Sequence, residues 1–265
     1  MKNKFLTCCA VAASLLWTSV AYAGPVSNYY VSVGGTQIKV VNGDNVVNSW
    51  NTVNGGEWSV NVYGDVRTNP AGQNAGSGSQ YSLAGAYTGV TYQEEVSGYQ
   101  DTDDSTTDGT YNYTVSYTSG DVIRTDRVFQ NAQSLFNTAI GSLGITYDET
   151  NNSLWIMSFA GTSIRNYGMN GNLLNSFAIK NGGTGALALD HADQTLWFAN
   201  SAGFIEQYSK TGTYLQTGIQ VGYALGGEFD FAEARPNANV PEPSAIALLG
   251  LGFLGMAFLR RKNKA

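Results

Sequence analysis

The chain has few of the residues that build common catalytic and metal centres. Its two cysteines, Cys8 and Cys9, lie in an N-terminal apolar segment, and His191 is its only histidine. From residue 24 onward there is no thiol, so disulfides, thiolate metal sites and Cys-His catalytic sets are excluded there. A pair of metal-binding histidines at helical spacing is excluded as well. We therefore assign no catalytic residue, no metal ligand and no cofactor.

Basic residues are also scarce. Residues 24–240 contain 19 of the 20 acidic residues but only 8 of the 14 basic ones, which gives this segment a net charge of −11. Such a charge argues against nucleic acid and anionic surfaces as partners. Long Leu/Glu/Lys/Ala stretches are missing too, and Asn, Gly, Ser, Thr, Tyr and Val dominate. This composition is typical of β-rich, turn-rich exported domains.

The N-terminus has the three parts of a secretory signal peptide. Lys2 and Lys4 supply positive charge ahead of the apolar run 5–20, and small residues follow at the positions that a signal peptidase reads. The residues expected at the cleavage site are Ala21, Ala23 and Gly24. Residues 1–23 are therefore predicted to be removed, and both cysteines leave with them.

The C-terminus combines a short motif, an apolar run and a basic end. Residues 245–259 are apolar, and as a helix they would span about 22 Å, less than a hydrocarbon core of about 30 Å. The basic residues 260–264 would hold the end of this marginal membrane helix in the cytoplasm. The residues that carry the signal are Val240, Pro241, Glu242, Pro243, Arg260 and Arg261.

This ordered set, with its Val-Pro-Glu-Pro-Ser motif at 240–244, resembles the PEP-CTERM sorting tail of Gram-negative bacteria. The resemblance implies recognition by an exosortase-type enzyme and removal of the tail, in bacteria that also make exopolysaccharide. It places the protein beyond the inner membrane, at the cell surface, in the outer membrane or in the extracellular matrix. We assign residues 237–265 to this tail, which contacts the membrane before processing.

An internal repeat marks the middle of the chain. Residues 145–148 are followed six residues after their aspartate by Leu154-Trp155, and residues 187–190 are followed at the same spacing by Leu196-Trp197. The two copies are offset by 42 residues. Each copy contains four short strands joined by turns, and four-stranded units of about 40 residues are typical of propeller blades.

The ends of the domain are predicted to meet. Residues 29–33, 37–41 and 46–50 look like the second, third and fourth strands of a blade that lacks a first strand. Residues 226–231 supply that strand, because Phe229 and Phe231 fall 42 residues after Leu187 and Leu189. Closure of this kind removes exposed sheet edges. We predict an all-β, β-propeller-like domain over 24–236, with five four-stranded blades, while six blades or an open β-sandwich remain alternatives.

The other two blades are less regular. One is expected over 55–87, beginning at Glu57, and the next takes 89–92 as its first strand. The acidic insertion 93–108 would then separate the first two strands of that blade. Its run 101–108 is interpreted as a solvated, flexible loop, or alternatively as a Ca²⁺ site built from closely spaced carboxylates.

The blade pattern, an apolar pair before Asp and then Leu-Trp, resembles propeller repeats of the NHL and SMP-30-like superfamily over residues 141–233. Asp148 and Asp190 recur at one repeat position and are interpreted as turn formers. His191 follows the second of these, where the sister copy has Glu149, and it is interpreted as a solvated turn residue. None of these residues is expected to be catalytic.

These observations favour a non-enzymatic structural or binding component of the cell surface or exopolysaccharide matrix. One alternative is a propeller-type lyase or hydrolase acting on carbohydrate or a lactone, because glycosidase chemistry needs only two carboxyl groups across a cleft. Another is a Ca²⁺-dependent adhesion module built around the acidic run. Several acids converging at one mouth of the propeller would favour the enzyme.

Overall fold

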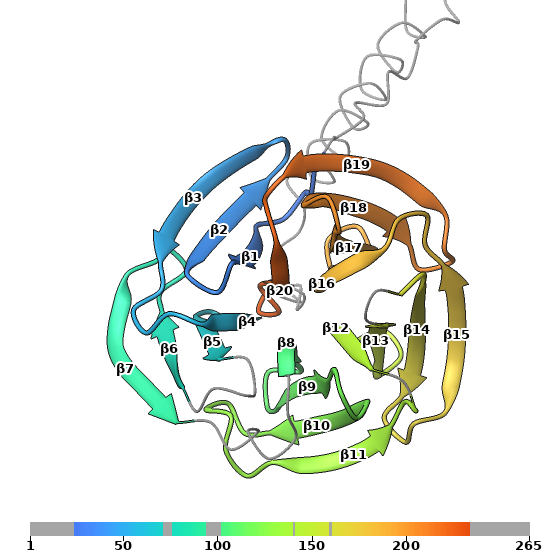
Figure 1. Ribbon diagram of the computed structural model, residues 1–265, viewed down its shortest axis with the longest axis horizontal. Helices are drawn as coiled ribbons and strands as arrows, with labels where there is room; N and C mark the ends of the chain where they lie inside the picture. Colours follow the sequence, from blue (N-terminus) through green and yellow to red (C-terminus); the bar gives the residue numbers. More distant parts are fainter. Residues whose placement is uncertain (1–23, 71–75, 94–101, 140, 159–160, 234–265) are drawn as a thin grey trace, which may run out of the picture.

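The computed structural model describes residues 24–70, 76–93, 102–139, 141–158 and 161–233. Within them, twenty β-strands form five antiparallel sheets of four strands each, arranged around a central axis (Figure 1). The fold is a five-bladed β-propeller, so the predicted fold class is confirmed. No helix among the described residues is long and apolar enough to cross a membrane.

Successive strands of every blade lie progressively further from the axis. Blade A contains β20 (Ala224–Phe229), β1 (Tyr29–Val33), β2 (Gln37–Asn42) and β3 (Asn45–Asn51). Blade B contains β4 (Glu57–Val62), β5 (Val66–Pro70), β6 (Ser77–Tyr81) and β7 (Tyr87–Gln93). Blade C contains β8 (Thr102–Thr107), β9 (Asn112–Ser116), β10 (Asp121–Thr125) and β11 (Gln133–Asn137). Blade D contains β12 (Ser142–Asp148), β13 (Ser153–Ser158), β14 (Ser163–Gly168) and β15 (Leu173–Ala178). Blade E contains β16 (Gly183–Asp190), β17 (Thr195–Asn200), β18 (Phe204–Ser209) and β19 (Tyr214–Gln220).

The five inner strands surround the axis and define two sides of the ring. We call the side on which they end, for example at Asp148 and Asp190, the mouth. We call the side on which they begin, for example at Glu57 and Thr102, the distal face. The outer strands β3, β7, β11, β15 and β19 follow the circumference (Figure 1).

The two ends of the domain meet in blade A, as predicted. The C-terminal strand β20 pairs with β1, and Phe229 lies opposite Tyr29. The predicted bounds of this strand, 226–231, were two residues late. The structural offset from blade E is 40 residues rather than 42, because the N–H groups of Leu187 and Gly227 occupy equivalent positions at the axis.

The predicted first strand of blade C was wrong. Residues 89–92 belong to β7, the outer strand of blade B, and the inner strand of blade C is β8, inside the predicted acidic insertion. All six residues of β8 are buried. The run is therefore a strand rather than a solvated loop. Its burial is possible because polar groups from other inner strands meet its side chains at the axis.

Neighbouring blades are joined by a repeated contact. In three blades an aromatic ring near the end of the outer strand packs on a glycine in the turn between the third and fourth strands of the next blade. The pairs are Trp50 with Gly85, Phe136 with Gly171, and Phe177 with Gly212. Each glycine has a positive φ, and a Cβ there would collide with the ring. The spacing of 35 residues within every pair reflects the regular stacking of blades.

Candidate functional site

The axis of the propeller is filled by the carboxylate of Asp104, from β8. Its Oδ1 accepts hydrogen bonds from the N–H groups of Ser105 and Gly227, both at 3.0 Å. Its Oδ2 accepts from Ile145 at 3.1 Å and from Leu187 at 3.0 Å. Backbone N–H groups from the inner strands of blades A, C, D and E thus all donate to this one carboxylate. Burial raises the pKa of Asp104 well above its usual value, while these N–H donors act in the opposite direction.

A second polar layer lies between Asp104 and the mouth. Thr146 donates to the Glu228 carboxylate at 3.3 Å and accepts from the N–H of Leu189 at 3.0 Å. Thr106 accepts from the N–H of Tyr147 at 3.0 Å. Burial raises the pKa of Glu228 well above its usual value. The axis is thus occupied by interacting side chains at these two levels.

Four inner strands end at the mouth with an aspartate in the same geometry. In each, Oδ1 accepts a hydrogen bond from the N–H two residues further on, at 2.7–3.1 Å. The four residues are Asp108, Asp148, Asp190 and Asp230. The interpretation of Asp148 and Asp190 as turn formers is confirmed. Asp108 and Asp230 were missed because their blades lack the Leu-Trp pair that marks the repeat.

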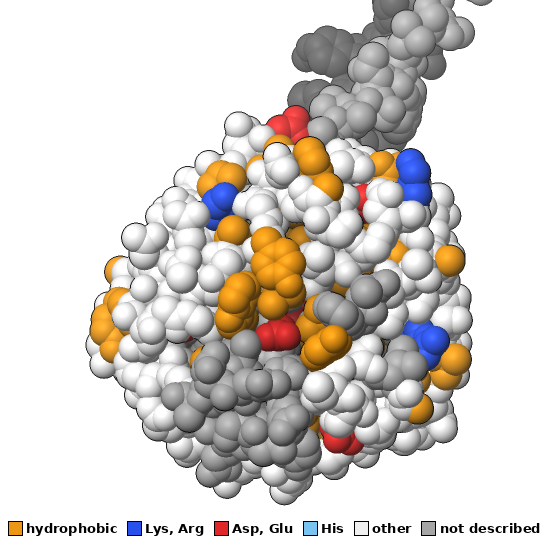
Figure 2. All heavy atoms as spheres, viewed as in Figure 1, with side chains coloured by type: hydrophobic (Ala, Val, Ile, Leu, Met, Phe, Trp, Pro, Cys, Tyr) orange, Lys and Arg blue, Asp and Glu red, His pale blue; other side chains and the backbone are white. Residues whose placement is uncertain are grey.

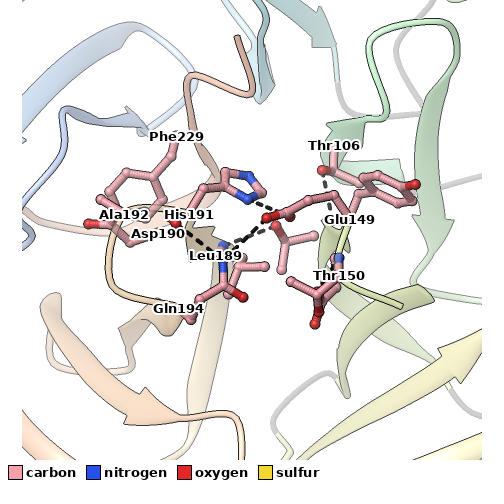
Figure 3. Close-up of polar contacts among 12 residues, drawn as sticks. Thr106, Glu149, Thr150, Leu189, Asp190, His191, Ala192, Gln194 and Phe229 are labelled. Carbon is pink, nitrogen blue, oxygen red and sulfur yellow. Dashed lines mark hydrogen bonds and ion pairs between the residues drawn. The ribbon is translucent and has the colours of Figure 1, made fainter. Parts of the chain in front are cut away.

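His191 and Glu149, which hold equivalent positions in blades E and D, contact each other across the mouth (Figure 3). His191 Nδ1 lies 2.7 Å from Glu149 Oε2, and Gln194 donates to Glu149 Oε1 at 3.2 Å. The His191 side chain is only 5% exposed, so its interpretation as a solvated residue was wrong. Burial alone would raise the pKa of Glu149, but the contacts with His191 and Gln194 place it below its usual value.

Two further groups close the mouth. Lys210 Nζ lies 2.8 Å from Asp148 Oδ2, the same oxygen that accepts from Trp155 Nε1 at 3.0 Å. Phe231 follows the closing strand, and its ring packs against Tyr63, Tyr147 and His191 from three blades. Several acids therefore converge at the mouth, as the enzyme alternative requires. The described residues contain no group of three or more His, Cys, Asp or Glu side chains placed to hold a metal ion.

The distal face has a different character. Figure 2 shows hydrophobic side chains gathered around an acidic one near its middle. The ring of Trp58 packs over Gly35, and the ring of Tyr223 meets it edge-on, at 84° and with centroids 6.2 Å apart. Tyr223 is 54% exposed. Burial and the nearby carboxylate of Asp103 raise the pKa of Tyr223.

The sequence-predicted processing residues are mostly outside the described part of the chain. This applies to Ala21 and Ala23 and to the sorting residues in 240–261. Gly24 is described and buried, and next to it the carbonyl of Pro25 accepts the N–H of Gly43 at 2.8 Å.

Comparison with known proteins identifies the tail and the fold. Residues 239–262 match the PEP-CTERM protein-sorting motif. No curated protein matches the chain. A chain of a nidogen/laminin complex is similar in structure, with a TM-score of 0.54 and 13% identity over 72% of this chain and 80% of that one.

Two bacterial enzymes are more distant. Virginiamycin B lyase from Staphylococcus aureus has a TM-score of 0.44, with 16% identity over 72% of this chain and 67% of the lyase. Glutaminyl cyclase from Myxococcus xanthus has a TM-score of 0.47, with 14% identity over 81% of this chain and 80% of the cyclase. At these identities the likeness concerns the fold alone. The motif implies export in a Gram-negative bacterium and processing by an exosortase. The chain thus carries a PEP-CTERM protein-sorting motif at residues 239–262, behind a domain with a five-bladed β-propeller fold.

Proposed function

We propose that this protein is a non-enzymatic binding component of the cell surface or exopolysaccharide matrix, and that it binds saccharide on its distal face. The observation that carries the proposal is the Trp58–Tyr223 pair beside Asp103. Tryptophan and tyrosine offer large, rigid contact areas at low cost in conformational entropy. The apolar face of a sugar ring packs on such rings, and its hydroxyl groups donate to a carboxylate.

We further propose that the mature domain is 24–236, after removal of the signal peptide 1–23, and that the tail 237–265 is cut off during sorting. Directly after the predicted cleavage site, the carbonyl of Pro25 accepts the N–H of Gly43, which ties the start of the proposed mature chain to blade A. The location of the sorting motif, beyond the closing strand of the propeller, supports the second boundary.

The carboxylates of the mouth support a structural role for that side. Asp148 is engaged by Lys210 and Trp155, and Asp190 by the backbone and hydroxyl of Ser27. The enzyme alternative rests on the His191–Glu149 pair, because a histidine oriented by a carboxylate is a common general base. The Ca²⁺ adhesion alternative depended on an exposed acidic loop, and β8 is buried.

Binding of the purified exported protein to exopolysaccharide from the producing bacterium tests the proposal. The double variant Trp58→Ala/Tyr223→Ala should bind at least about tenfold more weakly, because both stacking surfaces are lost. Tyr111→Ala, at another exposed tyrosine, is the matched control and should bind normally. Equal binding by the double variant, with an unchanged melting temperature, would refute the proposed site.

A further inference from the structure

Exposed apolar side chains occur at the same place in three successive blades. In blades D, E and A, two consecutive residues near the start of the outer strand are exposed, by 38–56%. We call these six residues the apolar rim: Leu173, Leu174, Tyr214, Leu215, Val46 and Val47. Successive strand residues point to opposite sides, so such pairs leave both sides of the strand uncovered. Figure 1 shows β15, β19 and β3 following one another along the outer edge.

The apolar rim lies on the mouth side of the ring. Each pair follows the turn between the third and fourth strands of its blade, and two of these turns are tied to the mouth. In blade E, Lys210 contacts Asp148 and Gln194. In blade A, the N–H of Gly43 donates to Pro25, two residues before the Ser27 that binds Asp190 at the mouth. In blade D, Asn175 donates to the carbonyl of Lys210 at 3.2 Å.

The chain also leaves the propeller on this side. Phe231 packs among mouth residues, and partial burial followed by the neighbouring carboxylates of Asp230 and Asp190 raises the pKa of Glu233. Eleven residues, 234–244, separate Glu233 from the apolar run 245–259. Even fully extended, eleven residues span at most about 40 Å. With the apolar run in the membrane, the mouth is held close to the bilayer.

We propose that, before the tail is removed, the apolar rim rests on the lipid bilayer that holds the tail. The short linker gives the rim an effective concentration at the membrane of about millimolar, so a weak contact is enough to orient the domain. The rim side chains enter the interface between headgroups and acyl chains. The distal face then points away from the membrane, toward the matrix.

Charges of both signs lie beside the rim. Asp44, in the turn before Val46, and Glu233 are exposed, whereas the ammonium of the exposed Lys180 lies 5.0 Å from the centre of the Tyr214 ring. Docking therefore rests on the apolar side chains and does not require anionic lipid.

The cysteine-free chain from residue 24 onward allows a direct test on residues 24–265, with the tail retained, in phosphatidylcholine vesicles. A single fluorophore is attached through Leu174→Cys in the rim, or through Val53→Cys, an exposed site in the loop that leads to the distal start of β4. Quenching by lipids that carry a shallow nitroxide should be at least threefold stronger for Leu174→Cys.

A second variant separates docking from tethering. Leu173→Ser/Leu215→Ser in the Leu174→Cys background should lower the quenching to the Val53→Cys level without changing the melting temperature. Equal quenching at both sites from the start would mean that the domain tumbles freely, and this would overturn the proposal. Protection of the Leu174→Cys label that depends on protein concentration and not on lipid would assign the rim to a second copy of the chain and would also overturn it.

Discussion

Blades D and E carry the same sequence pattern but use its aspartate differently. Asp148 and Asp190 are both buried, and both close a turn through Oδ1. In blade D the second oxygen accepts from Trp155 and Lys210. In blade E it accepts from the N–H of Ser27, and Trp197 Nε1 has no acceptor among the described residues.

The turn hydrogen bond through Oδ1 belongs to the repeat, whereas the partner of the second oxygen depends on the position of the blade in the ring. The repeat determines the turn, which every copy needs. The remaining oxygen is available for local use, and in blade E it holds the N-terminal segment that leads into β1. Blade E lies next to blade A, in which the ring closes. Its Asp190 therefore helps to hold the N-terminal segment, while the indole N–H of Trp197 has no acceptor among the described residues.

The largest loss of stability is expected on removing the Asp104 carboxylate, which accepts backbone N–H groups from both blade D and blade E. Asp104→Ala leaves the N–H groups of Ile145, Leu187 and Gly227 buried without their acceptor, so the free energy of unfolding should fall by about 4 kcal/mol or more. Asp104→Asn, which keeps the size but replaces one acceptor with a donor, should lose nearly as much. Denaturant unfolding measures both variants. The control Asp44→Ala, at an exposed turn, should stay within about 0.5 kcal/mol.

The next effect compares the two aspartates directly. Asp148→Ala leaves Trp155 Nε1 and Lys210 without their partner and should cost about 2–3 kcal/mol. Asp190→Ala should cost about 1–2 kcal/mol, because Ser27 is only partly buried. Only the second variant should accelerate hydrogen exchange in β1, next to the released segment. Equal losses and identical exchange patterns would contradict the comparison.

The sequence alone predicted those parts of the fold that depend on local sequence patterns. The second strands of blades D and E are continuous apolar runs, and the aspartate turns are local hydrogen bonds, so both follow from residues close together in the chain. Closure was predicted because a blade without a first strand requires one elsewhere. The two-residue error in its position arose because Phe229 and Phe231 both fit the apolar pattern.

What escaped prediction depends on contacts between distant residues. The strand β8 has the sequence Thr-Asp-Asp-Ser-Thr-Thr, which has no apolar alternation, and its burial rests on N–H groups from residues 41 to 123 positions away from Asp104. His191 likewise looks exposed from its turn. Its burial comes from Glu149 of the neighbouring blade and from Phe231, beyond the closing strand.

A smaller effect concerns acid stability in blade D. Burial would raise the pKa of Asp148, but hydrogen bonds from Lys210, Thr150 and Trp155 place it below its usual value. The ionised carboxylate therefore stabilises the fold above the unfolded-state pKa of about 4, and this contribution is lost as the pH falls through the lower folded-state pKa. Lys210→Met should cost about 1 kcal/mol at pH 7, since Lys210 is partly exposed, and almost nothing near pH 2. Melting curves across this range check the trend, and a loss independent of pH would argue against the ion pair.

The smallest loss of stability is expected at His191 and Glu149, which follow the two aspartates and bring blades E and D into contact. His191→Ala should lower the free energy of unfolding by about 1 kcal/mol, because the ring packs on Phe231 and lies 2.7 Å from Glu149. Glu149→Ala should cost a similar amount. If the two act as a pair, the double variant should lose about 0.5–1 kcal/mol less than the sum of the single variants. Additive losses would mean that the contact contributes nothing.

The same variants separate the structural role from catalysis, because loss of a general base lowers turnover by orders of magnitude while stability hardly changes. An activity abolished in His191→Ala at nearly native stability would therefore favour the lyase or hydrolase alternative over a binding protein.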